Sequence, residues 1–318
     1  MSPVAEAHEV VLPAVPGLGG LYARGAAGAA RLAVGGGGKR VSRPLPDVVY
    51  AVRDLHVDAS HLTAYQRLLG EPGTDALPAG YVHVLAFPVA TALMVRDDFP
   101  LPLLGMVHLA NRVEQRRPLT LGEALAVRAH AEAMRPHARG TQVDLVVEVT
   151  GGAGGDVAWR GVSTYLAPGL RLADDGPAGS GDTGSGDADG GDGPARERAP
   201  FVPPQPTGSW RLDAGTGRRY GAVSGDRNPI HLSALTAKPF GFPRAIAHGM
   251  YTASRLLADV GPVRGDAFTW TVEFVKPVLL PGTVAVSTRP AAEGGHDLAA
   301  WHPRSGKPHV LGRVAPLA

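Results

Sequence analysis

Two copies of one pattern of helices and strands run through this sequence, and the repeat limits the folds that the chain can adopt. In the first copy, an alternating segment over 47–57 is followed by a helix signal over 58–69, a strongly apolar stretch over 81–96 and then a series of alternating segments. In the second copy, the alternating segment 209–212 is followed by helix signals over 213–223 and 247–260 and then by the other alternating segments. Alternation of apolar and polar residues is typical of strands. The alternating segments are 47–57, 106–117, 124–133, 141–149 and 157–166 in the first copy and 209–212, 268–278, 297–302 and 309–314 in the second.

Helices followed by a run of antiparallel strands are characteristic of an α+β fold. The stretch 81–96 is apolar nearly all round, so we expect a buried helix that Pro88 kinks or restarts. Corresponding positions carry the same or similar residues in the two copies. The matched positions are Asp58 with Asp213, Tyr65 with Tyr220, Gly70 with Gly225, and 117–123 with 276–282. We therefore expect two copies of one unit, packed together as a dimer within one chain.

Composition divides the rest of the chain around these two copies. Residues 1–43 are rich in Ala and Gly and show no clear period, so we expect a mobile lead-in with at most one short helix. Residues 168–200 consist largely of Gly, Asp and Ser, which predicts a flexible linker. The N-terminal copy then occupies 44–167, and the C-terminal copy occupies 201–318.

The charge balance and the missing cysteines exclude several functional classes. The chain has 31 Lys and Arg against 29 Asp and Glu, and no basic stripe interleaved with aromatics, so a nucleic-acid partner is not expected. With no cysteine, disulfides, thiolate metal sites and cysteine nucleophiles are ruled out. The sequence shows neither an apolar run long enough to span a membrane nor a signal-peptide pattern. We therefore expect a cytoplasmic protein without a membrane partner.

One polar cluster distinguishes the second copy from the first. It is the segment 225–231, which reads G-D-R-N-P-I-H. The matching segment 70–75 reads G-E-P-G-T-D, so it keeps the Gly but has no Asn-Pro-x-His. A purely structural requirement would be expected in both copies. We infer that the second copy is active and that the first is degenerate.

The residues of this cluster suit acid–base chemistry on a water molecule. Unperturbed Asp and His side chains have pKa values of about 3.9 and about 6.5, so Asp226 and His231 together can hold a water and move protons near neutral pH. Gly225, Asn228 and Pro229 would shape the turn that aims both side chains into one pocket. The competing interpretation is a plain Asx turn that caps a helix near His231.

Two neighbouring residues have weaker claims to a role. Ser224 lacks the Gly-x-Ser-x-Gly context of a nucleophile, so we expect it to shape the site by packing or hydrogen bonding. Gly249 lies at the start of a helix, where the first N–H groups have no internal partner. A substrate carbonyl could approach this N–H closely, as in an oxyanion hole; alternatively, Gly249 only permits close helix–sheet packing. We expect His248 to be a core or capping histidine.

At this point the sequence resembles a known family. The segment Y-G-A-V-S-G-D-R-N-P-I-H over 220–231, followed by G-F-P-R-A-I-A-H-G-M over 241–250, is similar to the hydratase-2 motif of MaoC-like (R)-specific enoyl-CoA hydratases. From about 46 to 314, the chain resembles the double-hotdog (R)-3-hydroxyacyl-thioester dehydratases of actinobacteria. The stretches V-A-W-R-G-V-S-T-Y-L over 157–166 and F-V-K-P-V-L-L-P-G over 274–282 support this.

The resemblance implies a double-hotdog fold, in which each half wraps a long central helix in an antiparallel sheet. It implies reversible hydration of trans-2-enoyl thioesters to (R)-3-hydroxyacyl thioesters in fatty-acid metabolism. Asp226 and His231 would activate the water, and the N–H of Gly249 would polarise the thioester carbonyl. The degenerate half would supply an acyl-chain tunnel beside its apolar helix. No metal and no organic cofactor are expected, since the coenzyme A or acyl-carrier arm belongs to the substrate.

Two other functions are compatible with this fold. A hotdog thioesterase would hydrolyse the thioester with a carboxylate and would not need the Asn-Pro-x-His set. A non-catalytic acyl-binding subunit would not need the pair of Asp226 and His231. The repeat is compatible with a monomer that acts as an internal pseudo-dimer and with a homodimer.

Overall fold

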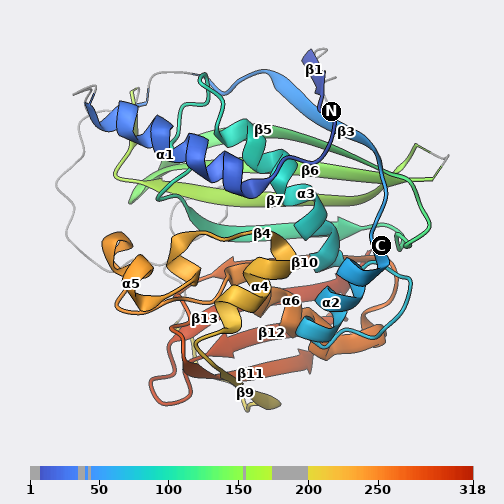
Figure 1. The fold of residues 1–318 in the computed structure, drawn as a ribbon. Helices are drawn as coiled ribbons and strands as arrows, with labels where there is room; N and C mark the ends of the chain where they lie inside the picture. Colours follow the sequence, from blue (N-terminus) through green and yellow to red (C-terminus); the bar gives the residue numbers. More distant parts are fainter. Residues whose placement is uncertain (1–7, 35–39, 42–43, 153–154, 174–199, 318) are drawn as a thin grey trace.

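The computed structural model describes residues 8–34, 40–41, 44–152, 155–173 and 200–317 (Figure 1). Its main element is an 11-stranded sheet with the order β1-β3-β5-β6-β7-β4-β10-β13-β12-β11-β9. All neighbouring strands in it are antiparallel except the pair of β1 and β3. The first-half strands are β1 His8–Val11, β3 Val48–Leu55, β4 Val107–Gln115, β5 Leu125–His137, β6 Gly140–Gly151 and β7 Val157–Pro168. The second-half strands are β9 Gly208–Leu212, β10 Phe268–Phe274, β11 Gly282–Pro290, β12 His296–Trp301 and β13 Pro308–Pro316.

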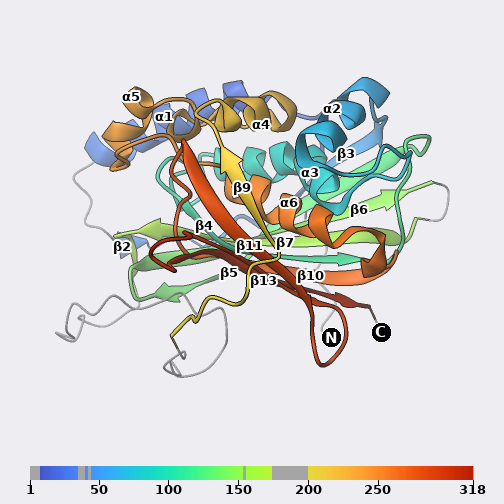
Figure 2. The same cartoon turned by 90° about the horizontal axis from the view of Figure 1, so that it is seen from below.

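The helices lie on one face of this sheet, in two layers (Figure 2). The inner layer holds α3 Ala79–Met94 and α6 Gly249–Val260, and the outer helices lie over them. The outer helices are α1 Leu18–Val34, α2 Ala59–Leu69, α4 Thr216–Ser224 and α5 Ala234–Ala237. Short 3-10 turns complete the set: η1 Pro229–His231, η2 Lys238–Phe240 and η3 Gly261–Arg264. A small separate pair joins β2 Arg40–Val41 to β8 Arg171–Leu172.

The two halves join along β4 and β10, which pair from Phe268 with Gln115 to Glu273 with Ala110. Each half wraps its own strands around one inner helix, so the structure has the expected α+β double-hotdog architecture. Almost every residue of α3 is buried, as its uniformly apolar sequence predicts. Pro88 lies inside α3 but does not end it, because the helix is continuous from Ala79 to Met94. Burial in the core stabilises this helix in spite of the missing N–H.

Specific contacts confirm the alignment of the two copies. Gly70 and Gly225 both end a helix in the left-handed conformation, with φ of 77° and 73°. Each inner helix is preceded by an isolated bridge, between Ala76 and Thr120 in the first copy and between Ile246 and Leu279 in the second. The matched tyrosines also make the same edge contact, Tyr65 with Tyr81 at 5.2 Å and Tyr220 with Tyr251 at 5.7 Å between ring centroids.

The copies differ at the first position of the alignment. Asp58 caps α2 and accepts a hydrogen bond from the His61 N–H. The α4 helix starts later, after Gly215, and Asp213 accepts from the Gly215 N–H in the preceding turn. The expectation that Asp213 opens the helix was therefore wrong by a few residues.

The N-terminal segment differs from the expected mobile lead-in. Residues His8–Val11 add β1 to the edge of the sheet beside β3, and α1 runs for 17 residues. Leu18 and Leu21 of α1 pack on Ala92 of α3. Contact with α3 therefore stabilises a helix whose Gly-rich sequence has a low intrinsic propensity.

Part of the expected linker over 168–200 lies outside the described residues, since 174–199 are not described. In the described part of the chain, no helix is long and apolar enough to cross a membrane.

Candidate active site

The backbone between α4 and η1 orients Asp226. The helix ends at Gly225, whose left-handed conformation redirects the chain. The Asp226 N–H then donates to Oγ of Ser224 at 3.2 Å. The Asn228 N–H donates to Oδ1 of Asp226 at 3.1 Å, which closes an Asx turn. Ser224, Gly225 and Asn228 thus lie around Asp226 and fix its orientation.

His231 is held at the end of η1. Asn228 caps this turn, since its Oδ1 accepts from the Ile230 N–H at 3.4 Å, and Pro229 occupies the first position. Nδ1 of His231 lies 2.8 Å from the carbonyl oxygen of Ile246. Because a carbonyl only accepts, we assign the proton to Nδ1 and a free lone pair to Nε2. The Asx turn therefore belongs to the same structure that positions His231.

Two glycines of α4 permit the close packing of this segment. A Cβ added at Gly217 would overlap the carbonyl oxygen of His231, and one added at Gly221 would lie 2.8 Å from the carbonyl oxygen of Asp226. Larger residues at either position would push the helix away from the cluster. The G-x-x-x-G spacing of Gly217 and Gly221 is thus the local reason that α4 can support both functional residues.

His248 belongs to this cluster, although the sequence analysis assigned it to the core or to a cap. It occupies the N-cap position of α6, but its side chain makes no capping hydrogen bond. Its ring stacks on His231 with centroids 3.6 Å apart. Nε2 lies 2.9 Å from the carbonyl oxygen of Asp226 and 3.6 Å from Oδ2 of the same residue. Its position next to Gly249 in the sequence was the signal that could have placed His248 in this cluster.

The fourth side chain of the cluster comes from the N-terminal segment. The hydroxyl of Tyr22 on α1 donates to Oδ1 of Asp226 at 2.6 Å. Oδ1 therefore accepts from both Tyr22 and the Asn228 N–H, which leaves Oδ2 facing His248. Tyr22 could not be predicted from the sequence, because a contact across 204 positions leaves no local pattern.

Burial and hydrogen bonding set the charges of this cluster. Burial lowers the pKa of His231 to about 3, and burial also lowers the pKa of His248. Burial alone would raise the pKa of Asp226, but His248, His231 and the hydrogen bond from Tyr22 hold it below its usual value. Near neutral pH the site therefore combines a carboxylate with two neutral imidazoles. A neutral imidazole can accept a proton, as general-base catalysis requires.

Gly249 is the first residue of α6, so its N–H has no partner within the helix. A Cβ added at this position would lie 2.7 Å from the ring of Phe274 on β10. This contact supports the interpretation that Gly249 permits close packing of the helix on the sheet. The N–H remains positioned at the positive end of the helix, next to His248.

Ligand atoms of Asp226, His231 and His248 lie within 4.8 Å of one another, a spacing that a cation could also use. Each imidazole has one nitrogen bonded to a backbone carbonyl. Only the other nitrogen of each ring would be free to coordinate a metal. These side chains can move protons without a metal ion. Removal of metal ions with a chelator tests whether a bound cation is needed.

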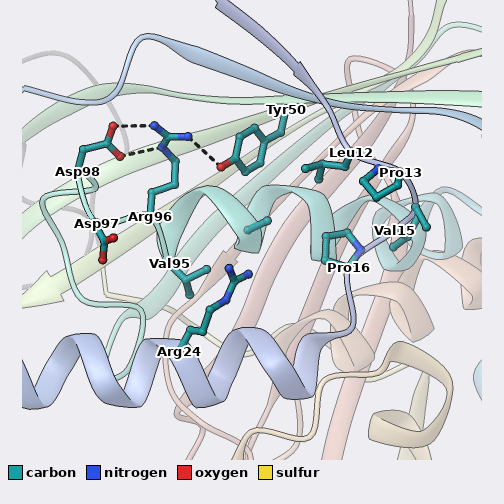
Figure 3. Close-up of a pocket in the computed structure, with 12 residues that line it drawn as sticks. Leu12, Pro13, Val15, Pro16, Arg24, Tyr50, Val95, Arg96, Asp97 and Asp98 are labelled. Atoms are coloured by element: carbon teal, nitrogen blue, oxygen red, sulfur yellow. Dashed lines mark hydrogen bonds and ion pairs between the residues drawn. The ribbon is translucent and has the colours of Figure 1, made fainter.

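A cavity of about 760 Å³ lies beside α1, and none of these residues lines it (Figure 3). Its wall includes Arg24 of α1, Tyr50 of β3 and Arg96 after α3. Arg96 donates to both carboxylate oxygens of Asp98 at 2.7 Å and to the Tyr50 hydroxyl at 2.9 Å. This cavity is therefore separate from the cluster around Asp226.

Comparisons with known proteins identify the family of this chain. Residues 203–296, which include the whole cluster except Tyr22, match the MaoC like domain. The chain is 36% identical over 273 residues to 3-hydroxyacyl-thioester dehydratase X of Mycobacterium tuberculosis, covering 86% of this chain and 91% of that protein.

Solved structures give the same result. The crystal structure of HtdX of Mycobacterium tuberculosis superposes with a TM-score of 0.70 at 34% identity, covering 85% of this chain and all of that one. A MaoC-like dehydratase of Phytophthora capsici has a TM-score of 0.62 at 20% identity, covering 85% of this chain and 95% of that one, and shares the fold. The chain therefore belongs to the MaoC-like dehydratase family.

Proposed function

We propose that this protein is a hydro-lyase that interconverts trans-2-enoyl thioesters and (R)-3-hydroxyacyl thioesters. The observation that carries the proposal is the cluster of Asp226, His231 and His248 within 4.8 Å, beside the N-terminus of α6. The relative in Mycobacterium tuberculosis that is 36% identical over 273 residues bears the name of a 3-hydroxyacyl-thioester dehydratase. The cluster offers what this reaction requires, which is a base for water and a donor for a developing oxyanion.

In the hydration direction, Asp226 and His231 hold the water. Oδ2 of Asp226 accepts one hydrogen of the water, and Nε2 of His231 takes the other as a proton. The oxygen bonds to C3 of the enoyl group while the C2–C3 π electrons move toward the thioester carbonyl. The proton from His231 then goes to C2. Dehydration follows the same steps in reverse, with His231 as the first base.

The thioester carbonyl gains negative charge in the transition state. The N–H of Gly249 at the positive end of α6 would stabilise that charge, and a fixed donor of this kind contributes about 100- to 1000-fold in rate. His248 donates to the backbone carbonyl of Asp226 and stacks on His231. It would hold both reacting groups in place rather than exchange protons with the substrate.

The first copy would no longer be catalytic. Glu71 occupies the position of Asp226, and it is buried in an ion pair with Arg264 at 3.5 Å. Pro78 and Ala79 stand where the active copy has His248 and Gly249. We assign 44–167 to this degenerate half and 201–318 to the catalytic half, with a thioester of coenzyme A or of an acyl carrier protein as substrate.

An absorbance assay tests the proposal against a thioesterase. The protein is mixed with trans-2-enoyl-coenzyme A of four to eight carbons, and loss of the enoyl absorbance and release of free thiol are followed together. We expect the enoyl absorbance to fall without release of free thiol. Chiral analysis should identify an (R)-3-hydroxyacyl product. Thiol release would identify a thioesterase. A folded protein that converts neither coenzyme A nor acyl-carrier substrates would be a binding subunit.

A further inference from the structure

The outer helices α2 and α4, one from each copy, lie side by side (Figure 2). His61 on α2 spans the contact between them. Its Nε2 lies 2.7 Å from the carbonyl oxygen of Val223 on α4, and its Nδ1 lies 2.9 Å from the hydroxyl of Tyr81 on α3. The imidazole therefore connects the inner helix of the first copy to the last turn of the helix that precedes Asp226.

The two partners of this ring fix the position of its proton. A carbonyl oxygen only accepts, so Nε2 of His61 carries the proton and donates to Val223. Nδ1 then accepts from the hydroxyl of Tyr81, a fully buried residue. His61 thus presents one directed donor to the end of α4, and a hydroxyl from the core holds the ring from its other side.

The chain leaves α2 and α4 in different ways, although both helices stop at a left-handed glycine. The N–H of Glu71 donates to the carbonyl oxygen of Gln66 at 2.9 Å, so the chain folds back over the end of α2. The N–H of Asp226, at the equivalent position, donates instead to Oγ of Ser224 at 3.2 Å. Side chains, Ser224 and His61, therefore hold the end of α4 where a backbone hydrogen bond holds the end of α2.

The contact between the copies runs in one direction. Thr216 is the residue of the second copy that aligns with His61. Its hydroxyl donates to Asp213 at 3.4 Å and accepts from Arg219 at 3.3 Å, both in its own copy. Among the described residues, no side-chain hydrogen bond joins Thr216 to α2. A requirement of the fold alone would be expected in both copies, whereas this support is given only to the copy that carries the polar cluster.

We infer that His61 is a positioning residue for Asp226. The inference rests on the proposed hydration of enoyl thioesters and adds a residue of the first copy to that site. By holding the last turn of α4, His61 fixes the direction in which Gly225 and Asp226 leave the helix. The first half thus supports the reaction although it lacks the water-activating pair.

Loss of this hydrogen bond should affect the site more than the fold. The last four C=O groups of a helix have no partner within it, and helix ends open more easily than the core. Asp226 follows Val223 by three residues, so a small movement of this turn displaces the carboxylate relative to His231. A displacement of about 1 Å can cost about 100-fold in rate.

Two substitutions of His61 test the inference. Leu has no donor and is a good helix former, so His61→Leu removes the hydrogen bond and preserves α2. Gln places an amide N–H near the position of Nε2, so His61→Gln keeps a donor to Val223. We expect His61→Leu to lower kcat about tenfold or more and to leave the binding of saturated octanoyl-coenzyme A within about twofold of the wild type. His61→Gln should recover most of the kcat.

Amide hydrogen exchange gives a measurement that does not depend on turnover. In His61→Leu, the backbone N–H groups of 222–231 should exchange faster than in the wild type, because the end of α4 has lost its donor. The N–H groups of α3 should exchange at the wild-type rate, which shows that the core is intact. His61→Gln should exchange like the wild type in both segments.

Thr63→Ala is the matched control on the same helix. The Thr63 hydroxyl donates to the carbonyl oxygen of Ala59 within α2 at 2.8 Å. Its substitution should change neither kcat nor the exchange over 222–231. A wild-type kcat in His61→Leu, or an equal loss of kcat in Thr63→Ala or in His61→Gln, would overturn the inference.

The exchange measurement also separates this inference from the proposed function. If the wild type converts no enoyl thioester, the proposed hydration fails, and exchange alone decides the role of His61. Faster exchange over 222–231 in His61→Leu and not in His61→Gln then supports its hold on the segment of Asp226. Equal exchange over 222–231 in the wild type and His61→Leu contradicts it.

Discussion

The hydroxyl of Tyr22 donates a 2.6 Å hydrogen bond to Oδ1 of Asp226, so a helix outside the matched domain completes the cluster. The contact fixes the carboxylate through one oxygen and leaves the other toward His248. It also makes α1 a wall of the site. The N-terminal segment thus contributes a side chain to the cluster.

Tyr22→Phe should lower turnover and shift its pH dependence. Hydrogen bonds to charged groups contribute about 1.5–3 kcal/mol, so kcat/KM should fall about ten- to a hundredfold. The bond from Tyr22 lowers the pKa of Asp226, so its loss raises that pKa. The acid limb of the pH–rate profile should then move to higher pH. A full profile of kcat/KM from pH 4 to pH 9 measures both effects.

Tyr50→Phe is the control for this change. Its hydroxyl accepts a hydrogen bond from Arg96 at 2.9 Å, on the cavity side of α1 and away from the cluster. Its removal should leave the acid limb in place. An unchanged profile in Tyr22→Phe would show that the contact has no part in catalysis.

The motif around Asp226 was readable from the sequence because its geometry is local. Ser224, Asn228 and Pro229 act on the backbone within five residues of the carboxylate, through a left-handed Gly, an Asx turn and a short 3-10 turn. The two copies could be aligned for the same reason, since Gly70 and Gly225 end equivalent helices. Local rules of turn and cap formation thus predicted this part of the site.

The parts of the site that could not be predicted from the sequence depend on tertiary packing. The α1 helix is rich in Gly and Ala, so its sequence shows no strong apolar stripe, and contact with Ala92 of α3 is what holds it. His248 enters the site because α6 starts against η1, and the sequence records only its neighbour Gly249.

Asp226→Asn and His231→Gln should each abolish most of the turnover. General acid–base catalysis contributes about 10²- to 10⁴-fold, and both residues act on the same water. The double variant should therefore be little worse than either single variant, which is the non-additive result expected of a unit. Binding of a saturated acyl-coenzyme A, measured by calorimetry, should change little. Asp213→Asn, at an exposed aspartate in the turn before α4, is the control with retained turnover.

Removal of metal ions should leave the activity unchanged. In the proposed steps, Asp226 and the neutral His231 activate water without a Lewis acid, although their ligand atoms are close enough for one. The protein is dialysed against a chelator and assayed with and without added divalent cations. Loss of activity that zinc or manganese restores would contradict the proposed role of His231.

Stability should fall as the pH falls below about 6.5. The pKa values of His83, His108 and His231 are lowered by burial to about 4, 3 and 3, whereas an unfolded histidine has a pKa of about 6.5. Between these values the unfolded chain binds more protons than the folded one, so acid favours unfolding. Above about pH 6.5 these rings are neutral in both states, so they no longer make the unfolding free energy depend on pH.

Urea unfolding at pH 7 and pH 5 measures this effect. Each buried neutral histidine should account for about 2 kcal/mol of the difference in unfolding free energy between the two pH values. His83→Leu should reduce the difference by about that amount, whatever its effect at pH 7. His56→Gln, at an exposed histidine, should not reduce it. If the wild type, His83→Leu and His56→Gln all lost the same unfolding free energy between pH 7 and pH 5, His83 would be protonated in the folded state at pH 5.

The buried pair of Glu71 and Arg264 should matter for stability and not for catalysis. Glu71 lies at the position of Asp226 in the first copy, and its side chain is 3% exposed against 15% for Arg264. Removing one partner of a buried ion pair costs about 3–5 kcal/mol, so Arg264→Gln should lower the free energy of unfolding at pH 7 by about that much. Burial raises the pKa of Glu71, and the loss of Arg264 would raise it further.

Protonation of Glu71 then becomes a way to relieve the uncompensated charge. The deficit of Arg264→Gln relative to the wild type should shrink between pH 7 and pH 5, because a neutral carboxyl needs no cation in the core. Glu71→Gln removes the carboxylate itself, so it should show no such recovery, and its kcat/KM should stay within about twofold of the wild type because the first copy holds no water-activating pair. Turnover lost in Glu71→Gln at full folding would mean that the first copy still takes part in the reaction.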